Sequence, residues 1–197
     1  MNIHPTLSGR RSLRAFSAQQ VDDNTFYSLF EAARWAASAF NEQPWRFIAT
    51  RKGEAAFERM ASCLAPANKS WAEHAAFLIL VAAKKDITKT GRPNKHASHD
   101  TGLAVGNLTF QATASGIALH QMGGFDAAMA ASTFGIPEEF EALTIIAGGY
   151  PGDPESLNEE LRQRETAARV RKPLDEMVFS EQFGHPHPLF MTPPHQN

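Results

Sequence analysis

The sequence predicts one mixed domain in which helices pack against a central sheet. Phe77–Val81 is a short, unbroken apolar run, which fits a strand covered on both faces. Residues 98–117 are apolar most of the way round a helix, which fits a buried helix. With 197 residues, 43% of them hydrophobic, the chain is long enough for one substantial core. Because no linker divides it, we expect a single domain over residues 1–197.

The first half of the chain predicts two helices and a strand before the central strand. Residues 21–37 form an amphipathic pattern, because Phe26, Leu29, Phe30 and Ala33 recur at three-and-four spacing. The expected elements that follow are a turn over 36–45, a strand over 46–50 and a helix over 54–64.

The elements expected in the second half are separated by glycine, proline or polar turns. After an exposed loop over 84–95 they are the buried helix over 98–117, a strand over 119–122, a helix over 127–134, a strand over 142–147 and a charged helix over 157–168. The last stretch, about 180–197, is rich in proline and histidine and cannot form regular helix. Such a tail either dangles or wraps a neighbour, as an arm on a partner subunit would.

Composition excludes several classes of function. Cys63 is the only cysteine, so an intramolecular disulfide and a cysteine zinc cage are ruled out, and its helical surroundings indicate a packed thiol. No apolar run is long enough to cross a bilayer, and the N-terminus lacks the features of a signal peptide. We therefore expect a soluble, cytoplasmic protein with no membrane partner. A pI near 6.4 argues against bulk nucleic-acid binding.

A metal site is not expected either. The tail histidines His185, His187 and His195 have no carboxylate or cysteine companions at ligand spacing.

A cluster of arginines near the N-terminus indicates an anion site. Arg10, Arg11 and Arg14 place three guanidinium groups within five residues, and Ser12 adds a hydroxyl, in a chain of net charge −2. Guanidinium forks match phosphate oxygens two at a time. The alternative is a solvated basic turn or a nucleic-acid arm. A second cationic cluster, with Arg169 and Arg171, lies near the other end of the chain.

The turn over residues 36–45 is a second candidate contact. Its small side chains permit close approach of a flat group to the backbone, and Asn41 and Gln43 offer both donors and acceptors. The edge of a ligand fits there.

Five motifs in order resemble the nitroreductase family of flavin enzymes. They are Arg10-Arg11-Ser12-x-Arg14-x-Phe16; Glu31 to Phe47 with Ser38-Ala39-x-Asn41; Asp100-x-Gly102-x-Ala104-x-x-Asn107-Leu108; Gly123-Gly124-Phe125-Asp126; and Gly148-x-Tyr150-Pro151-Gly152-Asp153 with the later Arg169-x-Arg171-Lys172-Pro173. The likeness runs from Arg10 to about Phe179. Each motif is weak alone, but five in register are hard to obtain by chance.

The resemblance implies a nitroreductase-like fold of the α+β class. In this fold a mixed, mostly antiparallel sheet packs between helices in an intertwined homodimer. Two flavin mononucleotide (FMN) sites then lie at the dimer interface, each built from both chains. The reductant would be NADH or NADPH, and the sequence does not discriminate between them.

The resemblance also assigns residues to FMN. The assigned cofactor-binding residues are Arg10, Arg11, Ser12, Arg14, Ser38, Ala39, Asn41, Asn68, Gly123, Gly124, Arg169 and Arg171. Arg10 and Ser12 match positions at the phosphate and ribityl chain, and Arg14 matches the position at N1 and O2. Arg169 and Arg171 match a second phosphate-binding pair. The turn residues 38–41 would come from the partner, and the two glycines would face N5 and O4. Up to four arginines meeting one phosphate would account for two basic clusters in a balanced chain.

The expected activity is ping-pong hydride transfer from NAD(P)H through flavin N5 to an aromatic acceptor such as a nitroaromatic or a quinone. No side chain is assigned a catalytic role, because the flavin carries the chemistry. Phe40, Trp71 and Phe110 are candidate walls for a flat acceptor, with core packing as the alternative for each. His120 is either a proton donor or a hydrogen-bonded scaffold residue.

Two departures from the family pattern bear on specificity. Ala37 stands where a proline is common, and Gly123 where some members carry an acidic residue. Two alternative functions remain. One is a specialised family branch that dehalogenates, fragments flavin or oxidises peptide-derived rings. The other is a non-catalytic flavoprotein that acts as a redox sensor or stores flavin.

Overall fold

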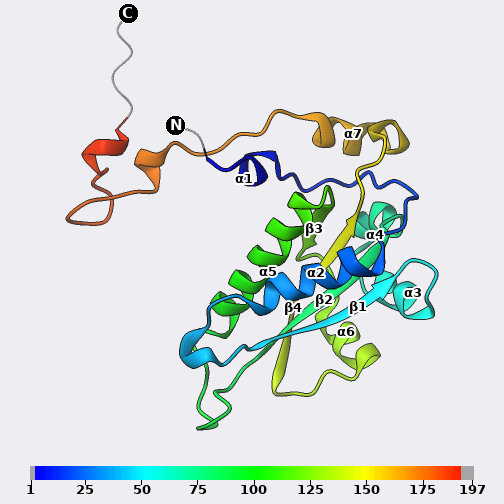
Figure 1. The fold of residues 1–197 in the computed structure, drawn as a ribbon, viewed down its shortest axis with the longest axis horizontal. Helices are drawn as coiled ribbons and strands as arrows, with labels where there is room; N and C mark the ends of the chain where they lie inside the picture. The colour runs from blue at the N-terminus through cyan, green and yellow to red at the C-terminus, as the bar shows by residue number, and fades with distance from the viewer. Residues whose placement is uncertain (1–2, 192–197) are drawn as a thin grey trace, which may run out of the picture. The chain divides into compact units, whose positions relative to one another are not determined.

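The computed structural model describes residues 3–191. The chain divides into a compact body that ends at Glu165 and a second unit that begins at Thr166. The compact body holds all four strands and the large helices (Figure 1). The functional groups predicted from the N-terminal motifs therefore lie in one unit, and the second arginine pair lies in the other.

The sheet has four strands, and every neighbouring pair is antiparallel. The strands are β1 (Trp45–Arg51), β2 (Phe77–Lys84), β3 (Ala118–Met122) and β4 (Phe140–Gly149). They are ordered β1-β2-β4-β3, with a register shift in β2 between Val81 and Ala82. The predicted α+β class is confirmed.

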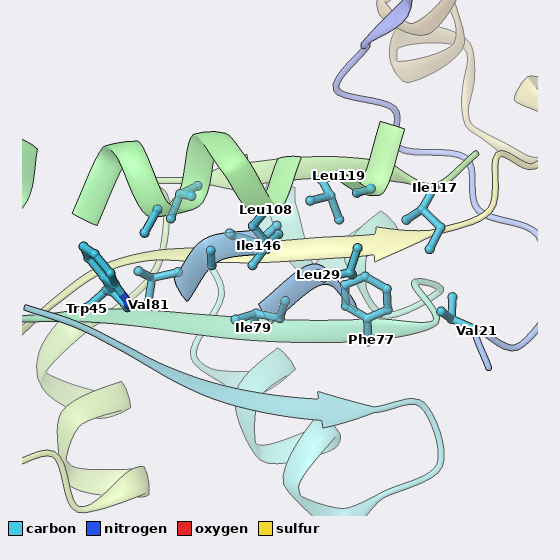
Figure 2. Close-up of a cluster of buried hydrophobic side chains, with 14 of the residues drawn as sticks. Val21, Leu29, Trp45, Phe77, Ile79, Val81, Leu108, Ile117, Leu119 and Ile146 are labelled. Atoms are coloured by element: carbon cyan, nitrogen blue, oxygen red, sulfur yellow. The ribbon is translucent and has the colours of Figure 1, made fainter. Parts of the chain in front are cut away.

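Strand β2 is buried on both faces, as its unbroken apolar run predicts. Phe77, Ile79 and Val81 belong to one core cluster, whereas Leu78 and Leu80 belong to the other. Successive side chains of a strand point to opposite faces, so a strand between two cores must be apolar at every position. Figure 2 shows the first cluster, where β2 meets Ile146 of β4.

Two layers of helices supply those cores. Helices α2 (Asp23–Arg34) and α5 (Ala97–Ala114) contribute to the first cluster, through residues such as Leu29 and Leu108. The second cluster contains residues of α3 (Ala55–Ser62), α4 (Pro66–Ala72) and α6 (Ala127–Phe134). The sheet therefore lies between helices on both faces, as Figure 1 shows.

The local start and stop signals explain the helix boundaries. The Asp22 carboxylate accepts a hydrogen bond from the amide of Thr25 at 2.9 Å and begins α2. Helix α6 ends at Gly135, which is left-handed at φ 61°. Two short helices escaped prediction, α1 (Pro5–Gly9) and α4, and in both a proline occupies the first turn.

Helix α5 differs from its prediction in burial. Leu108 and Ala112 are fully buried, but Leu103 and Phe110 are exposed in the single chain. An added Cβ at Gly102 or Gly106 would meet nothing within 4 Å. Helix α5 therefore has two apolar faces. One packs in the core, and the other is exposed in the single chain.

The second unit is short and mostly irregular. It follows helix α7 (Glu159–Thr166) and contains two 3₁₀ turns, η3 (Leu174–Glu176) and η4 (Pro188–Phe190). Residues 192–197, including His195, lie outside the described residues. The arm on a partner subunit therefore stays a prediction.

Cys63 is buried within the second core cluster, which confirms a packed thiol. Burial raises the pKa of this thiol above its ordinary value. Among residues 3–191, no helix combines the length and apolar character that a membrane crossing needs. In the same range no group of three or more histidine, cysteine or acidic side chains is placed to hold a metal.

Candidate functional site

The N-terminal arginines form a local cluster, which we call the arginine segment (residues 9–16). Arg10 donates from Nη1 to Ser12 Oγ at 3.1 Å. Arg10 and Arg11 also line one cavity of about 200 Å³ beside Thr113 and Gly116 at the end of α5. The structure therefore brings together the guanidinium and hydroxyl groups predicted to meet a phosphate.

The end of this segment is paired with the chain that follows β4. The amide of Ser17 donates to Tyr150 O and the amide of Gly152 donates to Ala15 O, both at 2.9 Å. A Cβ on Gly152 would lie 2.5 Å from the carbonyl carbon of Phe16. Only glycine permits this approach, so the motif around Tyr150 serves to hold the arginine segment in place.

Arg14 is fixed by a buried carboxylate on α7. Glu165 Oε1 accepts hydrogen bonds from the Arg14 amide at 2.7 Å and the Ala15 amide at 3.0 Å. Its Oε2 lies 3.5 Å from Arg14 Nη1, with side-chain exposures of 2% for Glu165 and 20% for Arg14. Sequence reasoning missed Glu165 because α7 is polar all round and offers no periodic signal.

Trp71 and His120 support the other side of Arg14. The Arg14 guanidinium carbon lies 5.9 Å from the Trp71 ring centroid, and the Trp71 and His120 rings are 4.5 Å apart. Trp71 is only 2% exposed, so in the single chain it packs in the core. His120 Nδ1 lies 3.1 Å from Leu13 O, which places the imidazole as a support for the arginine segment.

Burial lowers the pKa of His120 below its ordinary value, and the positive charge of Arg14 lowers it further. Its contact with Leu13 O requires the Nδ1–H tautomer. We therefore expect a neutral imidazole near pH 7, which fits the scaffold alternative for this residue.

Asn68 and the two-glycine turn after β3 come together. Asn68 Nδ2 donates to Gly124 O at 3.0 Å, and a Cβ on Gly124 would lie 2.7 Å from that nitrogen. A Cβ on Gly123 would meet nothing within 4 Å, so this position faces open space. Gly123 follows His120 by three residues, about 10 Å along a strand. Strand β3 thus connects this turn to the arginine segment, which His120 contacts at Leu13 O.

The turn after α2 is held in an unusual conformation. Phe40, Asn41 and Gln43 have positive φ values of 54°, 56° and 48°. Ser38 Oγ accepts from the Gln43 amide at 3.0 Å, and Asp100 Oδ2 accepts from the Ala39 amide at 2.8 Å. Left-handed non-glycine residues cost about 1–3 kcal/mol each and concentrate at binding sites. The buried Asp100 carboxylate therefore fixes a strained turn that carries four predicted site residues, Ser38, Ala39, Phe40 and Asn41.

This turn and the arginine segment lie at opposite ends of α5. Asp100, in the first turn of the helix, holds Ala39, whereas Thr113, in the last turn, lines the cavity of Arg10 and Arg11. The rise from Asp100 to Thr113 is about 20 Å at 1.5 Å per residue. Within one chain, the turn over residues 38–41 and the arginine segment are therefore separated by the length of α5. In the sequence analysis, these two parts of one FMN site were assigned to different subunits.

The second cationic cluster lies in the C-terminal unit. Arg171 donates from Nη1 to Val170 O at 2.8 Å, and its side chain is exposed. The convergence of Arg169 and Arg171 with the first cluster stays a prediction.

Comparison with known proteins defines the class of this fold and site. The Nitroreductase family matches residues 7–150. The chain therefore belongs to the Nitroreductase family.

Individual relatives agree with this family. An uncharacterised 15.4 kDa protein of Mycolicibacterium smegmatis is 32% identical over 72% of this chain and 99% of its own length. A protein of Archaeoglobus fulgidus, named "Putative NADH dehydrogenase/NAD(P)H nitroreductase", is 30% identical over 76% of this chain and 86% of its own. A solved structure described as an oxidoreductase containing FMN is 29% identical, covers 94% of both chains and has a TM-score of 0.89.

We predict that His120 makes the folded protein lose stability on acidification. Its pKa is lower in the folded state than its ordinary value of 6.5, so below about pH 6.5 the unfolded state binds more protons and the free energy of unfolding falls. Denaturant titrations at about pH 7.5 and pH 5.5 measure this change. The free energy of unfolding should fall less between the two pH values in His120→Gln than in the wild type. The exposed His74→Gln is the matched control. A loss in His120→Gln equal to that of the wild type would contradict the assignment.

Proposed function

We propose that this chain is an FMN-dependent oxidoreductase that takes hydride from NADH or NADPH and reduces an aromatic acceptor, such as a nitroaromatic or a quinone, by a ping-pong route. The observation that carries the proposal is the placement of Arg10, Ser12 and Arg14 on one fixed segment, which His120 of β3 contacts, with the Asn68–Gly124 pair at the end of the same strand. The FMN-containing relative of the same fold supports it.

The residues present fit an FMN. Arg10, Arg11 and Ser12 would hold the phosphate and ribityl chain, because the Arg10–Ser12 contact of 3.1 Å lets both bind one anion. Arg169 and Arg171 would join them from the C-terminal unit. Arg14 would face the N1 and O2 edge, and the ring's other edge would meet Asn68, Gly123 and Gly124. The open space at Gly123 leaves room for that edge.

When bound, FMN supplies two-electron chemistry at N5. Arg14 would hold a cation beside the N1 and O2 edge of a bound FMN, where it would favour hydride acceptance. Gly123 offers its backbone without a side chain that would block the ring. His120, neutral and hydrogen-bonded to Leu13 O, holds the arginine segment, so we assign it to the scaffold.

The three predicted acceptor walls differ in exposure. Phe40 is 88% exposed and Phe110 is 40% exposed, so both can meet a flat acceptor. Trp71 is buried against Arg14 and His120. We therefore propose Phe40 and Phe110 as acceptor contacts and assign Trp71 to the support of Arg14.

We also propose that the active form is a homodimer. The exposed face of α5 carries Leu103 and Phe110 beside Gly102 and Gly106, where a second helix can approach closely. A second copy would bring its Ser38, Ala39 and Asn41 to a flavin held by the first chain's arginines. This arrangement joins the two half-sites that α5 separates.

The proposed activity predicts a yellow protein that is bleached by reductant. Anaerobic addition of NADH or NADPH should remove the flavin absorption, because FMN is reduced, and addition of a quinone should restore it. Stopped-flow absorption measures both half-reactions. A flavin-storage protein would stay oxidised, and a colourless protein that takes up no added FMN would contradict the cofactor assignment.

We predict that Arg171→Ala loses FMN on dialysis. Removal of one charge-assisted phosphate contact should raise the FMN dissociation constant by about ten- to a hundred-fold. Flavin fluorescence titration measures this constant. Arg164→Ala is the control, because Arg164 pairs with Glu160 on the exposed surface of α7. Equal affinity in Arg171→Ala and the wild type would remove Arg171 from the site.

We predict that Gly106→Arg converts the dimer to a monomer that does not retain FMN. The added side chain would fill the open face of α5 without touching the core of its own chain. Light scattering after gel filtration gives the mass, and the ratio of flavin to protein absorption gives FMN retention. Ala128→Arg, on the exposed side of α6, is the control. A fully dimeric Gly106→Arg would place the interface elsewhere.

A further inference from the structure

Glu165 contacts the arginine segment through both its carboxylate and its backbone carbonyl. Its carbonyl oxygen accepts a hydrogen bond from Arg11 Nη2 at 2.7 Å. Its Oε1 accepts the two backbone amides of Arg14 and Ala15, and its Oε2 pairs with Arg14 Nη1. One residue on α7 thus contacts the side chains of Arg11 and Arg14 and the backbone amides of Arg14 and Ala15.

The burial of this carboxylate has a cost that its contacts must offset. Removing a carboxylate from water costs several kcal/mol, and a buried ion pair often contributes less than a well-packed apolar replacement. Two backbone amides and one guanidinium offset the cost here by satisfying the carboxylate oxygens. The buried Glu165 carboxylate therefore places a fixed negative charge beside Arg14 in the candidate site.

The surroundings of Arg14 show what the Glu165 charge does. The guanidinium lies between the Trp71 ring and the Glu165 carboxylate, so it has a fixed place. His120 holds the preceding residue through Leu13 O. The charge that Arg14 offers to a ligand is thus partly offset by Glu165, since the two groups are 3.5 Å apart.

We propose that Glu165 is a positioning residue for the cofactor, which fixes the backbone that presents Arg10, Ser12 and Arg14 and tempers the positive charge that Arg14 directs at the flavin. This inference rests on the proposed function. It assigns Glu165 two separable contributions, one from its acceptor geometry and one from its charge.

Two substitutions separate these contributions. Glu165→Gln keeps an oxygen that can accept both amides but removes the negative charge. Glu165→Ala removes the acceptor as well. Glu160→Gln is the matched control, because it removes a negative charge from the exposed surface of the same helix.

Geometry is tested by FMN affinity. Glu165→Ala should raise the FMN dissociation constant about tenfold or more, because the arginine segment loses its anchor, whereas Glu165→Gln should stay within about threefold of the wild type. Fluorescence titration of the apoprotein gives these values.

Charge is tested by the two-electron midpoint potential of the bound flavin. Without the Glu165 charge, Arg14 should stabilise reduced over oxidised FMN about tenfold more strongly, which moves the potential of Glu165→Gln about 30 mV more positive. Glu160→Gln should leave it unchanged. A potential in Glu165→Gln equal to that of the wild type would overturn the proposal, and so would an unchanged affinity in Glu165→Ala.

Amide hydrogen exchange on the apoprotein separates this proposal from the proposed function. The amides of Arg14 and Ala15 should exchange slowly in the wild type and in Glu165→Gln, and faster in Glu165→Ala. A wild type that binds no FMN but shows this pattern would refute the proposed function and keep the anchor role. Rapid exchange of both amides in the wild type would refute the anchor role itself.

Discussion

The structure of this site depends on one buried carboxylate. Glu165 accepts two consecutive backbone amides, those of Arg14 and Ala15, and this geometry fixes the direction of the chain between them. The three arginines of this segment repel one another, and a negative group beside them offsets that repulsion. Glu165 supplies that group from a helix more than 140 residues away in the sequence.

The sheet provides the frame on which the anchor acts. Strand β3 carries His120 beneath the arginine segment and ends at the glycine turn, so both edges of the candidate site are placed by one short strand. Strand β4 continues into Tyr150 and Gly152, which pair with residues 15–17. Both strands contribute buried residues to the two core clusters, so the site rests on strands that are packed on both faces.

Local chemistry in the sequence predicted much of this arrangement. The apolar run of β2 and the helix over 127–134 follow from short-range rules. The burial of Glu165 and of Trp71 does not, because each depends on contacts between segments far apart in the chain. A polar helix such as α7 gives no sign of which carboxylate turns inward, and the sequence left Trp71 open as an acceptor wall or as a core residue. The strand order β1-β2-β4-β3 is likewise a tertiary property.

Helix α5 was predicted to be buried, but one of its faces is exposed in the single chain. Its residues are apolar nearly all round, yet one face with Gly102 and Gly106 stays open. The same helix separates Asp100, which braces the strained turn, from Thr113, beside the arginines, by about 20 Å. The open face and the divided site both fit the homodimer proposed above, in which a second copy would pack on α5. Such a copy would cover the apolar face and set the strained turn of one chain against the arginine segment of the other.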